Sequence, residues 1–481
     1  MIDVRPVGYV VGLLVATLGA TMAVPLGVDI AMGNAGWEGF LEGAMISLAV
    51  GGSVTVACAN GAHEKLTLQQ VFLLTTGVWL ALPVFGALPF WLGHPEARYV
   101  DAFFEAMSGL TTTGSTVFSG LDQMPEGVLL WRGMLQWFGG VGIIVVAMVF
   151  LPELGVGGMQ LFKSEGFETE GKILPRASQI AAQISVIYLT LTVACGMMYA
   201  GLGMSGFDAM VHAMTTVATG GFANYDASFG QFTGPMQYVA VVFMLLAALP
   251  FVRYVQILAG DPQPIFRDRQ VRGFFATVSV LVLALALWQW SRAGFGETGF
   301  REALFNTVSI MTGTGYASAD YMRWGSFAVV FFFVIGLIGG CAGSTACSIK
   351  IFRYQLLFAS LRAQVRRIHS PNALAQPRYD GKPVGEEILS SVMVFFVTFV
   401  LSLGLLSVAL GMTGLDTITA LSGAGAAIAN IGPGLGPEIG PAGNFGGLND
   451  AAKWLLAAGM LVGRLELLAV FTLLTPQFWR A

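Results

Sequence analysis

Residues 311–316 read "MTGTGY", a run of Thr and Gly in a chain that otherwise avoids polar residues. Taken alone it is an ordinary turn, because Gly reaches backbone angles that other residues adopt only with strain. Its meaning depends on whether it recurs. Related segments occur three more times, as "TTTGST" at 111–116, "ATGGFAN" at 218–224 and "NIGPGLG" at 430–436.

The composition places the chain in a membrane. It is 55% hydrophobic and only 11% charged, which excludes a soluble globular protein of ordinary make-up. A helix needs about 20 apolar residues to cross the hydrocarbon core. Ten such runs occur, at about 8–31, 38–58, 70–93, 128–151, 178–203, 236–258, 273–291, 326–350, 388–411 and 451–475. The sequence therefore predicts an all-α polytopic membrane protein with ten transmembrane helices.

The placement of Lys and Arg predicts the orientation of these spans. If the N-terminus is cytoplasmic, seventeen basic residues fall on the inner side, six on the outer side, and Arg464 alone within a span. Inner segments carry the excess of Lys and Arg. We therefore expect a multi-pass protein of the cytoplasmic (inner) membrane with both termini in the cytoplasm.

The Gly/Thr segments belong to four internal repeats, which align on Gly114, Gly221, Gly315 and Gly432. Each repeat has an acid that we expect at the start of a short helix: Asp101, Asp208, Glu302 and Asp416. This acid lies thirteen residues before the shared glycine in the first three repeats and sixteen residues before it in the fourth. The predicted units are a two-helix N-terminal unit at 1–66 and repeats at 67–160, 161–265, 266–385 and 386–481.

A short helix followed by Gly and Thr is too short to span, so it must dip into the membrane and return. Irregular backbone survives there only where it is buried in protein or lines water. Four helix C-termini facing one axis favour a cation, and loop carbonyls can replace its hydration shell. The predicted filter residues are Thr112, Thr113, Gly114, Thr219, Gly220, Gly221, Thr312, Gly313, Thr314, Gly315, Asn430, Ile431 and Gly432. The alternative for each loop is a helix cap or turn without ion contact, and for Thr111 we prefer capping.

These four loops, with "GGCAGSTACSIKIFR" at 339–353, resemble the Trk/Ktr/HKT superfamily of potassium transporters, and its bacterial TrkH branch in particular. The resemblance covers nearly the whole chain. It implies four helix, pore-loop, helix units in pseudo-four-fold arrangement around one pore, with K+ bound at the filter. It also implies a homodimer and a cytosolic ring of TrkA-type nucleotide-binding subunits that opens the pore. Because the loops share only one aligned glycine, we expect looser selectivity than a TVGYG filter gives.

Acids recur after the filter, five to eight residues past the shared glycine, at Asp122, Asp226, Asp320 and Glu438. A rim of carboxylates at the outer mouth would concentrate cations. The alternative is that exposed loops carry these acids for solubility.

Arg464 lies mid-span, where a charge is costly and usually faces a cavity or a partner. The resemblance implies that it is an electrostatic barrier in the ion path beneath the filter. The alternative is pairing with a carboxylate or carbonyl of another repeat. Glu466, two positions on, points elsewhere on the helix and is not its natural partner.

The eighth run is interrupted by Gly-rich sequence, and the resemblance implies an intramembrane gate loop at 339–348. The expected gate residues are Gly339, Gly340, Cys341, Ala342, Gly343, Ser344 and Thr345. Helix packing by the glycines is the alternative, and Ala346, Cys347 and Ser348 stand where relatives often have further glycines. We expect Lys350 and Arg353 to mark the cytoplasmic end of this span.

The segment "LRAQVRRIHSPNALAQPRYDGKPVGEE" at 361–387 is too polar for lipid and is expected in the cytoplasm, as a linker or as a dock for the regulatory subunit or anionic lipid. No nucleotide-binding fingerprint occurs, so a nucleotide must bind the partner, and we expect no cofactor in this chain. We expect no nucleic-acid partner either. No catalytic motif occurs, so we do not expect an enzyme.

Other functions stay open at this stage. One is a proton- or sodium-coupled cation symporter, and a less favoured one is a solute symporter, which usually has a two-fold inverted repeat. Acids within the apolar segments are few, Glu105 and Glu466. His212 could carry a proton, although a packed histidine is the plainer interpretation. Cys341 and Cys347 could bind a metal, although buried thiols usually only pack.

Overall fold

The computed structural model of the protein describes residues 2–61, 66–149, 158–159, 177–294, 296–372 and 375–480. Four basic residues assigned to the inner side, Lys65, Lys163, Lys172 and Arg176, lie outside these ranges. The expected boundary between repeats 1 and 2, at residue 160, lies outside them too.

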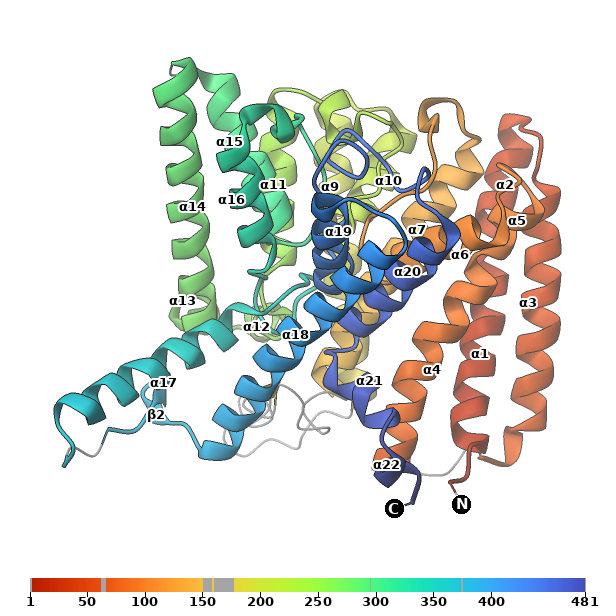
Figure 1. Ribbon diagram of the computed structural model, residues 1–481. Helices are drawn as coiled ribbons and strands as arrows, with labels where there is room; N and C mark the ends of the chain where they lie inside the picture. Colours follow the sequence, from red (N-terminus) through yellow and green to blue (C-terminus); the bar gives the residue numbers. More distant parts are fainter. Residues whose placement is uncertain are drawn as a thin grey trace.

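The N-terminal unit is a closely packed helix pair. Helices α1 (Arg5–Thr21) and α2 (Ala23–Met32) form one apolar rod, and α3 (Glu38–Ala57) runs beside α1 before the short η1 (Ala59–Gly61) (Figure 1). A Cβ on Gly12 would overlap the carbonyl of Gly51, and one on Gly51 would overlap the backbone of Ala16. Small residues at these positions let the two backbones approach, as in other membrane helix pairs.

The rest of the chain is four helical units in sequence. The first contains α4 (Leu68–Gly86), α5 (Leu88–Leu92), α6 (Tyr99–Leu110), η2 (Leu121–Gln123) and α7 (Glu126–Val149). The second contains α9 (Ala177–Gly201), α10 (Gly206–Val217), η4 (Ser228–Gln231), α11 (Pro235–Ala247) and α12 (Phe251–Leu258). The third contains α13 (Gln263–Arg267), α14 (Arg269–Ala293), α15 (Glu297–Met311), η5 (Tyr321–Trp324), α16 (Ser326–Gly336) and α17 (Ile351–His369). After the hairpin β1 (Arg378–Tyr379) and β2 (Lys382–Pro383), the fourth contains α18 (Glu386–Met412), α19 (Thr417–Ala429), α20 (Asp450–Arg464), α21 (Leu468–Leu473) and α22 (Pro476–Arg480).

The expectation of ten continuous spans is confirmed only in part. Among the described residues, seven helices are long and apolar enough to cross a membrane, or eight if the bent pair α11 and α12 counts as one. That pair bends by 87° at a break next to Pro250, which cannot donate a helical hydrogen bond. The predicted spans at 326–350 and 451–475 are not continuous helices, because α16 ends at Gly336 and α20 at Arg464.

The short helices begin as predicted in three repeats. Asp101 and Asp208 lie in the first turns of α6 and α10, and Asp416 caps α19 through the N–H groups of Ile418 and Thr419. The prediction for Glu302 is wrong. Helix α15 begins five residues earlier, with Glu297 in its first turn and bound to Arg301 at 2.8 Å. Glu297 therefore takes the position at the positive end of that helix.

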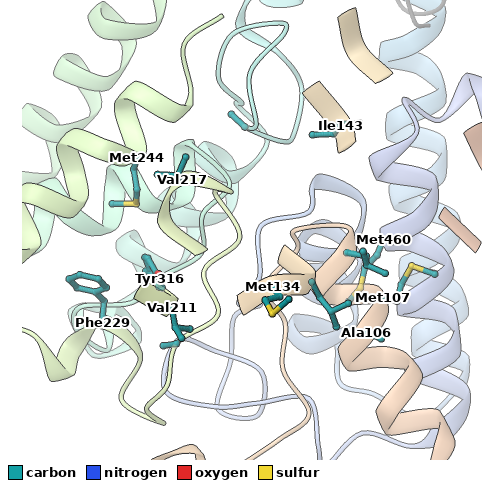
Figure 2. Packing of buried hydrophobic residues seen from close by; sticks show 14 of the residues in the cluster. Ala106, Met107, Met134, Ile143, Val211, Val217, Phe229, Met244, Tyr316 and Met460 are labelled. Atoms are coloured by element: carbon teal, nitrogen blue, oxygen red, sulfur yellow. The ribbon is translucent and has the colours of Figure 1, made fainter. Parts of the chain in front are cut away.

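The core lies where the four units meet. Figure 2 shows Met107 of α6, Met134 of α7, Met244 of α11 and Met460 of α20 among its buried side chains. Methionine is unbranched and adaptable, so it suits the irregular spaces between short helices and loops. Both chain termini lie at one end of the molecule, and α17 and the β hairpin lie toward that same end (Figure 1).

Candidate functional site

The four short helices α6, α10, α15 and α19 end in the same backbone motif. In each, the residue two positions before the shared glycine is left-handed: Thr112 (φ 51°), Thr219 (φ 49°), Gly313 (φ 76°) and Asn430 (φ 50°). The next N–H then bonds the carbonyl five residues back, at 2.9, 2.9, 2.9 and 3.0 Å in chain order. This is the Schellman termination of a helix. The alternative interpretation of the loops, a helix cap, thus applies to the residue two positions before the shared glycine. The shared glycine itself lies beyond the cap.

The shared glycines join the four loops into a closed ring. All four have positive φ: Gly114 (86°), Gly221 (77°), Gly315 (81°) and Gly432 (106°). A Cβ on each would come closer than 3.0 Å to a backbone oxygen of another loop. The contacts are Gly114 with Gly220, Gly221 with Thr314, Gly315 with Ile431, and Gly432 with Thr113. The shared glycine of each loop therefore contacts the residue just before the shared glycine of the next loop. The glycine of the fourth loop contacts the first loop in the same way, which closes the ring.

Threonine hydroxyls around the ring mostly form hydrogen bonds within their own loop or its short helix. Thr111 Oγ1 donates to the carbonyl of Met107 at 2.6 Å, in agreement with the capping interpretation. Thr113 and Thr314 contact the hydroxyls of Thr111 and Thr312, each at 2.8 Å. These hydroxyl contacts tie neighbouring residues of each loop together.

Asn430 connects three parts of the site. Its Nδ2 donates to Thr113 Oγ1 and to the carbonyl of Met460, both at 2.9 Å. The fourth loop is thereby tied to the first loop and to α20. The sequence prediction included Asn430 among the filter residues but did not foresee this cross-link.

A buried ion pair supports the first and second loops from behind. Arg132 Nε lies 2.8 Å from Glu105 Oε1, with side chains 1% and 0% exposed. Glu105 accepts the N–H of Val117 at 2.9 Å, and Arg132 Nη1 donates to the carbonyl of Ala223 at 2.8 Å. The pair therefore links α6 and α7 to the segments that follow two of the ring glycines.

Gln136 of α7 holds the second loop directly. Its Nε2 donates to the carbonyl of Gly220 at 2.6 Å, and its Oε1 accepts the N–H of Phe222 at 3.0 Å. The sequence analysis overlooked Arg132 and Gln136 as site residues. The available signal was their polarity within the apolar run 128–151, which usually marks a functional position.

The third loop is anchored to the second short helix through Tyr316. Its hydroxyl lies 2.5 Å from Thr215 Oγ1 and 3.3 Å from the carbonyl of His212. His212 Nδ1 lies 2.8 Å from the carbonyl of Asp208, and its ring packs edge-on against Phe232. This histidine is buried and packed, as the plainer interpretation expected.

Outside the ring lies a cavity of about 200 Å³ that all four ring glycines line. Asp226 also lines it, and its carboxylate accepts the N–H groups of Gly120 and Leu121 at 2.8 and 3.1 Å. Asp122 is exposed beside it and accepts the N–H of Asp226 at 3.3 Å. Two of the four predicted outer acids thus contact each other, and one of them, Asp226, lines the cavity.

The other two acids are arranged differently. Asp320 caps η5 and pairs with Arg323 at 3.1 Å, and neither Asp320 nor Glu438 is among the residues that line the cavity. Glu438 is exposed. The structure therefore places the four acids unequally around the mouth.

On the opposite side of the ring, Arg464 meets Cys347. Arg464 Nη1 lies 2.7 Å from Cys347 Sγ, and Nη2 donates to the carbonyl of Gly139 at 3.2 Å. Cys347 Sγ is in turn 3.6 Å from Thr112 Oγ1. A cavity of only about 30 Å³ remains here, lined among others by Asn430 and both partners. Arg464 thus contacts a carbonyl of another repeat, as its alternative expected, and also lies directly beneath the ring.

The loop between α16 and α17 is docked into the break between α11 and α12. The N–H of Cys341 bonds the carbonyl of Ala248 at 3.1 Å, and the N–H of Phe251 bonds the carbonyl of Gly343 at 2.9 Å. Thr345 Oγ1 donates to the carbonyl of Ala247 at 3.0 Å. Three of the seven predicted gate residues, Cys341, Gly343 and Thr345, therefore bond this break. The residue that reaches the ring is Cys347, two positions beyond them.

Lys350 and Arg353, expected at the cytoplasmic end of the eighth span, lie at the start of α17, and Arg353 is not exposed there. Its guanidinium is buried, is paired with Glu466, and stacks 3.7 Å from the ring centroid of Phe395. Glu466 lies in the break between α20 and α21, with φ of 60°. The pair ties the start of α17 to the residues just after Arg464.

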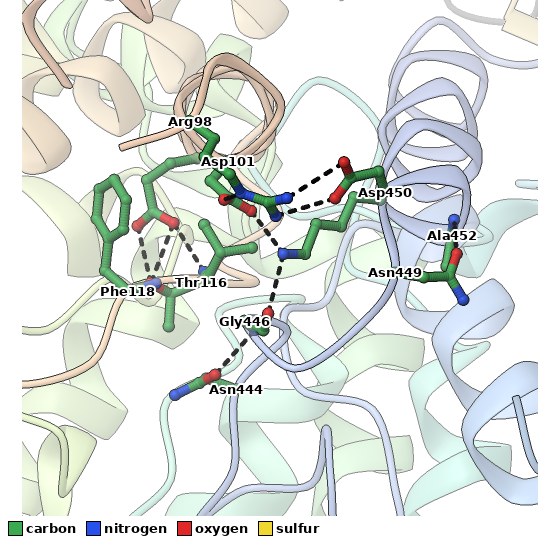
Figure 3. A network of polar contacts seen from close by, with 12 residues as sticks. Arg98, Asp101, Thr116, Phe118, Asn444, Gly446, Asn449, Asp450 and Ala452 are labelled. Atoms are coloured by element: carbon green, nitrogen blue, oxygen red, sulfur yellow. Dashed lines mark hydrogen bonds and ion pairs between the residues drawn. The ribbon is translucent and has the colours of Figure 1, made fainter. Parts of the chain in front are cut away.

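A polar network joins the first and last repeats (Figure 3). Lys453 is buried, and its Nζ donates to Asp101 Oδ1 at 2.6 Å and to the carbonyl of Gly446 at 2.9 Å. Arg98 bridges Asp101 and Asp450, at 3.0 and 2.9 Å. The network positions the first turn of α6 against α20.

Comparisons with known proteins give a consistent result. The family model TrkH, described as a cation transport protein, matches residues 38–480. The Trk system potassium uptake protein TrkI of Halomonas elongata is 43% identical over 486 residues, covering 99% of this chain and 97% of that protein. TrkH of Escherichia coli K12, also a Trk system potassium uptake protein, is 36% identical over 483 residues, covering 99% of each.

A solved structure agrees with these relatives. The crystal structure of the potassium transporter TrkH from Vibrio parahaemolyticus superposes with a TM-score of 0.92 at 34% identity, covering 100% of both chains. The similarity therefore extends over the whole fold.

Proposed function

Because the chain belongs to the TrkH family of cation transport proteins, we propose that it is the pore subunit of a Trk potassium uptake system and moves K+ through the ring of four loops. Family membership confirms the resemblance indicated by the four glycine segments. The protein is a membrane transport protein and not an enzyme.

The observation that carries the proposal is the closed ring of Gly114, Gly221, Gly315 and Gly432. A cation that enters a narrow pore needs oxygens to replace its hydration shell. The ring packs four main chains so closely that no side chain fits between them, at the negative ends of four helices. K+ is the transported ion, and no separate cofactor is part of the proposal.

We expect modest selectivity for K+ over Na+. Two backbone oxygens near the ring are already hydrogen-bonded, that of Gly220 to Gln136 and that of Gly432 to Ser115 Oγ at 2.6 Å. With one shared glycine per loop, fewer complete carbonyl rings remain than in a longer filter.

Cys347 and Arg464 close the inner side of the filter in this proposal. The arginine places a positive charge beneath the ring and opposes a cation there. The loop at 339–348 acts as the gate, and opening moves Cys347 away from the ring. The hydrogen bonds to Ala247 and Ala248 and the Arg353–Glu466 pair would hold the closed position.

Orientation and partners are part of the same proposal. Both termini, α17 and the hairpin lie toward one end of the molecule, and α17 carries Arg362, Arg366 and Arg367. We assign that end to the cytoplasm of an inner membrane, following the excess of basic residues. A TrkA-type nucleotide-binding subunit would dock there and open the gate, and the chain would act as a homodimer.

The test is rubidium-tracer uptake into proteoliposomes that hold only this chain and an internal potassium load, with external K+ or Na+ as competitor. Gly315→Ser should abolish the preference for K+, because a side chain there would overlap the carbonyl of Ile431. The matched control is Gly381→Ser, which has a similar positive φ of 78° in the hairpin loop and no neighbour within 4 Å. If rubidium uptake by Gly315→Ser still prefers K+ over Na+ as competitor, the filter assignment is contradicted. If uptake by the unmodified chain needs a proton or sodium gradient, a symporter is favoured instead.

A further inference from the structure

A cavity of about 450 Å³ lies between α1, α4 and α7, away from the ring of loops. Its lining is almost wholly apolar, with Leu14, Leu74, Val78, Val141 and Val145 as representatives. Leu14, which lines the cavity, is 37% exposed, so the cavity opens to the lateral surface of the protein along α1. Neither the proposed ion path nor the gate uses it.

The polar groups of the cavity wall are already occupied. The hydroxyls of Thr17, Thr21, Thr75 and Ser185 line it, and each donates to a backbone carbonyl three or four residues earlier in its own helix, at 2.7–2.8 Å. A water molecule would need two to four polar partners to be held in such a cavity. The wall therefore favours an apolar occupant.

The position of the cavity identifies that occupant. The helices that form it, α1 with α2, α4 with α5, and α7, all meet the length and apolarity of membrane spans. The lining residues lie mainly at 10–21, 74–82 and 138–146, in helices that are long and apolar enough to span a membrane, with Leu110 and Ser185 beside them. At this depth the surrounding medium is lipid hydrocarbon. A recess that opens sideways here is accessible to acyl chains.

The back wall of the cavity contacts the pore. Trp79 and Gly139 line the cavity, and both also contact Arg464: its guanidinium lies 5.6 Å from the Trp79 ring centroid and donates to the Gly139 carbonyl at 3.2 Å. Leu110, the last residue of α6, lines the cavity as well. One layer of residues thus separates the cavity from Arg464 and from the first filter loop.

We propose that this cavity binds an acyl chain of a membrane phospholipid, and that the bound chain holds Trp79 and Gly139 in the positions that fix Arg464. A wall without a partner loses dispersion contacts on one side, so Trp79 would have more freedom when the site is empty. Through this contact, the lipid that surrounds the protein influences the charge beneath the filter. This coupling to the pore rests on the proposed function, whereas the lipid site does not.

The site is tested by photolabelling the reconstituted full chain with a phospholipid that carries a diazirine on its acyl chain, followed by mapping of the labelled residues. Gly142→Leu fills the cavity, because a Cβ there meets only the Trp79 ring, at 3.8 Å. The matched control is Gly404→Leu on the exposed face of α18, with no neighbour within 4 Å. Val78→Trp is a second filling variant in case Gly142→Leu folds poorly, which size-exclusion elution reports.

We expect severalfold more label on Leu14, Val78 and Val145 than on exposed α18 residues such as Val400 and Leu405. We expect that excess to disappear in the filling variant and to persist in Gly404→Leu. Equal labelling of both surfaces, or labelling unchanged by the filling variant, would overturn the site. These labelling measurements need no ion transport, so they can disprove the lipid site whether or not the proposed function is correct. Because the added side chain would itself support Trp79, the coupling predicts that rubidium flux of Gly142→Leu no longer depends on the acyl-chain length of the membrane, whereas flux of Gly404→Leu does. Flux of Gly404→Leu that is insensitive to acyl-chain length, with label bound, would overturn the coupling to Arg464.

Discussion

Arg132 Nε lies 2.8 Å from Glu105 Oε1, and both side chains are excluded from solvent behind the first two loops of the ring. Removing one partner leaves the other as an uncompensated buried charge, which costs about 3–5 kcal/mol. Arg132→Ala should therefore lower thermal stability strongly and, where protein can still be reconstituted, reduce the preference for K+ in tracer uptake. The control is Arg323→Ala, whose side chain is 85% exposed, and whose pair with Asp320 should be worth less than about 1 kcal/mol. Equal melting temperatures for the two variants would contradict the structural role of the buried pair.

Gln136→Leu should alter selectivity more than stability. The substitution keeps the size of the side chain but removes the hydrogen bonds to the Gly220 carbonyl and the Phe222 N–H. With the Gly220 carbonyl released, the second loop can shift against its neighbours, and Na+ should compete better with K+ in tracer uptake. Gln69→Leu is the comparison, because Gln69 bonds the carbonyl of Phe478 near the C-terminus, far from the ring. Unchanged competition in Gln136→Leu would show that this hydrogen bond does not shape the filter.

The sequence predicted the ring better than the helices around it. The four glycines have a positive φ in every repeat, and only the repetition of the motif revealed that requirement. The start of α15 was misplaced because Glu297 and Glu302 are both plausible N-terminal acids, and tertiary packing chose between them. The end of α20 was missed because apolar composition alone does not distinguish a continuous helix from one broken by a turn, whereas the Gly-rich interruption of the eighth run did predict the break after α16.

Contacts between distant segments could not be predicted from one sequence. Cys347 meets Arg464 across 117 residues, and Arg353 meets Glu466 across 113. Both contacts depend on where the loop after α16 crosses the molecule, which no local pattern specifies. The prediction for Arg353 therefore placed it at a helix end without foreseeing its buried partner, and the prediction for Cys347 did not foresee its contact with Thr112 in the ring.

Thr345→Val should raise the basal flux. Valine has the shape of threonine but lacks the hydroxyl that bonds the carbonyl of Ala247, so docking of the gate loop weakens by about 1 kcal/mol. Tracer uptake without any partner subunit measures the effect. Thr398→Val is the control, because that exposed hydroxyl bonds only the carbonyl of Val394 in its own helix. If both variants conduct like the unmodified chain, the loop is not held closed by this contact.

Arg464→Ala should increase K+ flux and weaken its dependence on voltage. The substitution removes the positive charge beneath the ring together with its contacts to Cys347 and Gly139. Arg464→Lys keeps a charge at this position, so its K+ flux should lie between that of the unmodified chain and that of Arg464→Ala. Arg292→Ala, on the exposed end of α14, serves as a control for loss of a positive charge elsewhere. The measurement is flux at several imposed membrane potentials. A barrier role is wrong if Arg464→Ala changes neither the conductance nor its voltage dependence.

Neutralising the outer acids should lower K+ flux at low ionic strength and matter little at high salt. Surface charges attract cations over about 10 Å at 0.1 M salt and over shorter distances as salt rises. The four acids contribute unequally, because Asp226 lines the outer cavity while Asp320 is paired with Arg323. Asp122→Asn should therefore reduce low-salt flux more than Asp320→Asn does. Asp226→Asn tests charge and structure together, since this carboxylate also accepts the N–H groups of Gly120 and Leu121. Equal low-salt flux in the fourfold neutral variant and the unmodified chain would mean that the acids serve only the solubility of the outer loops.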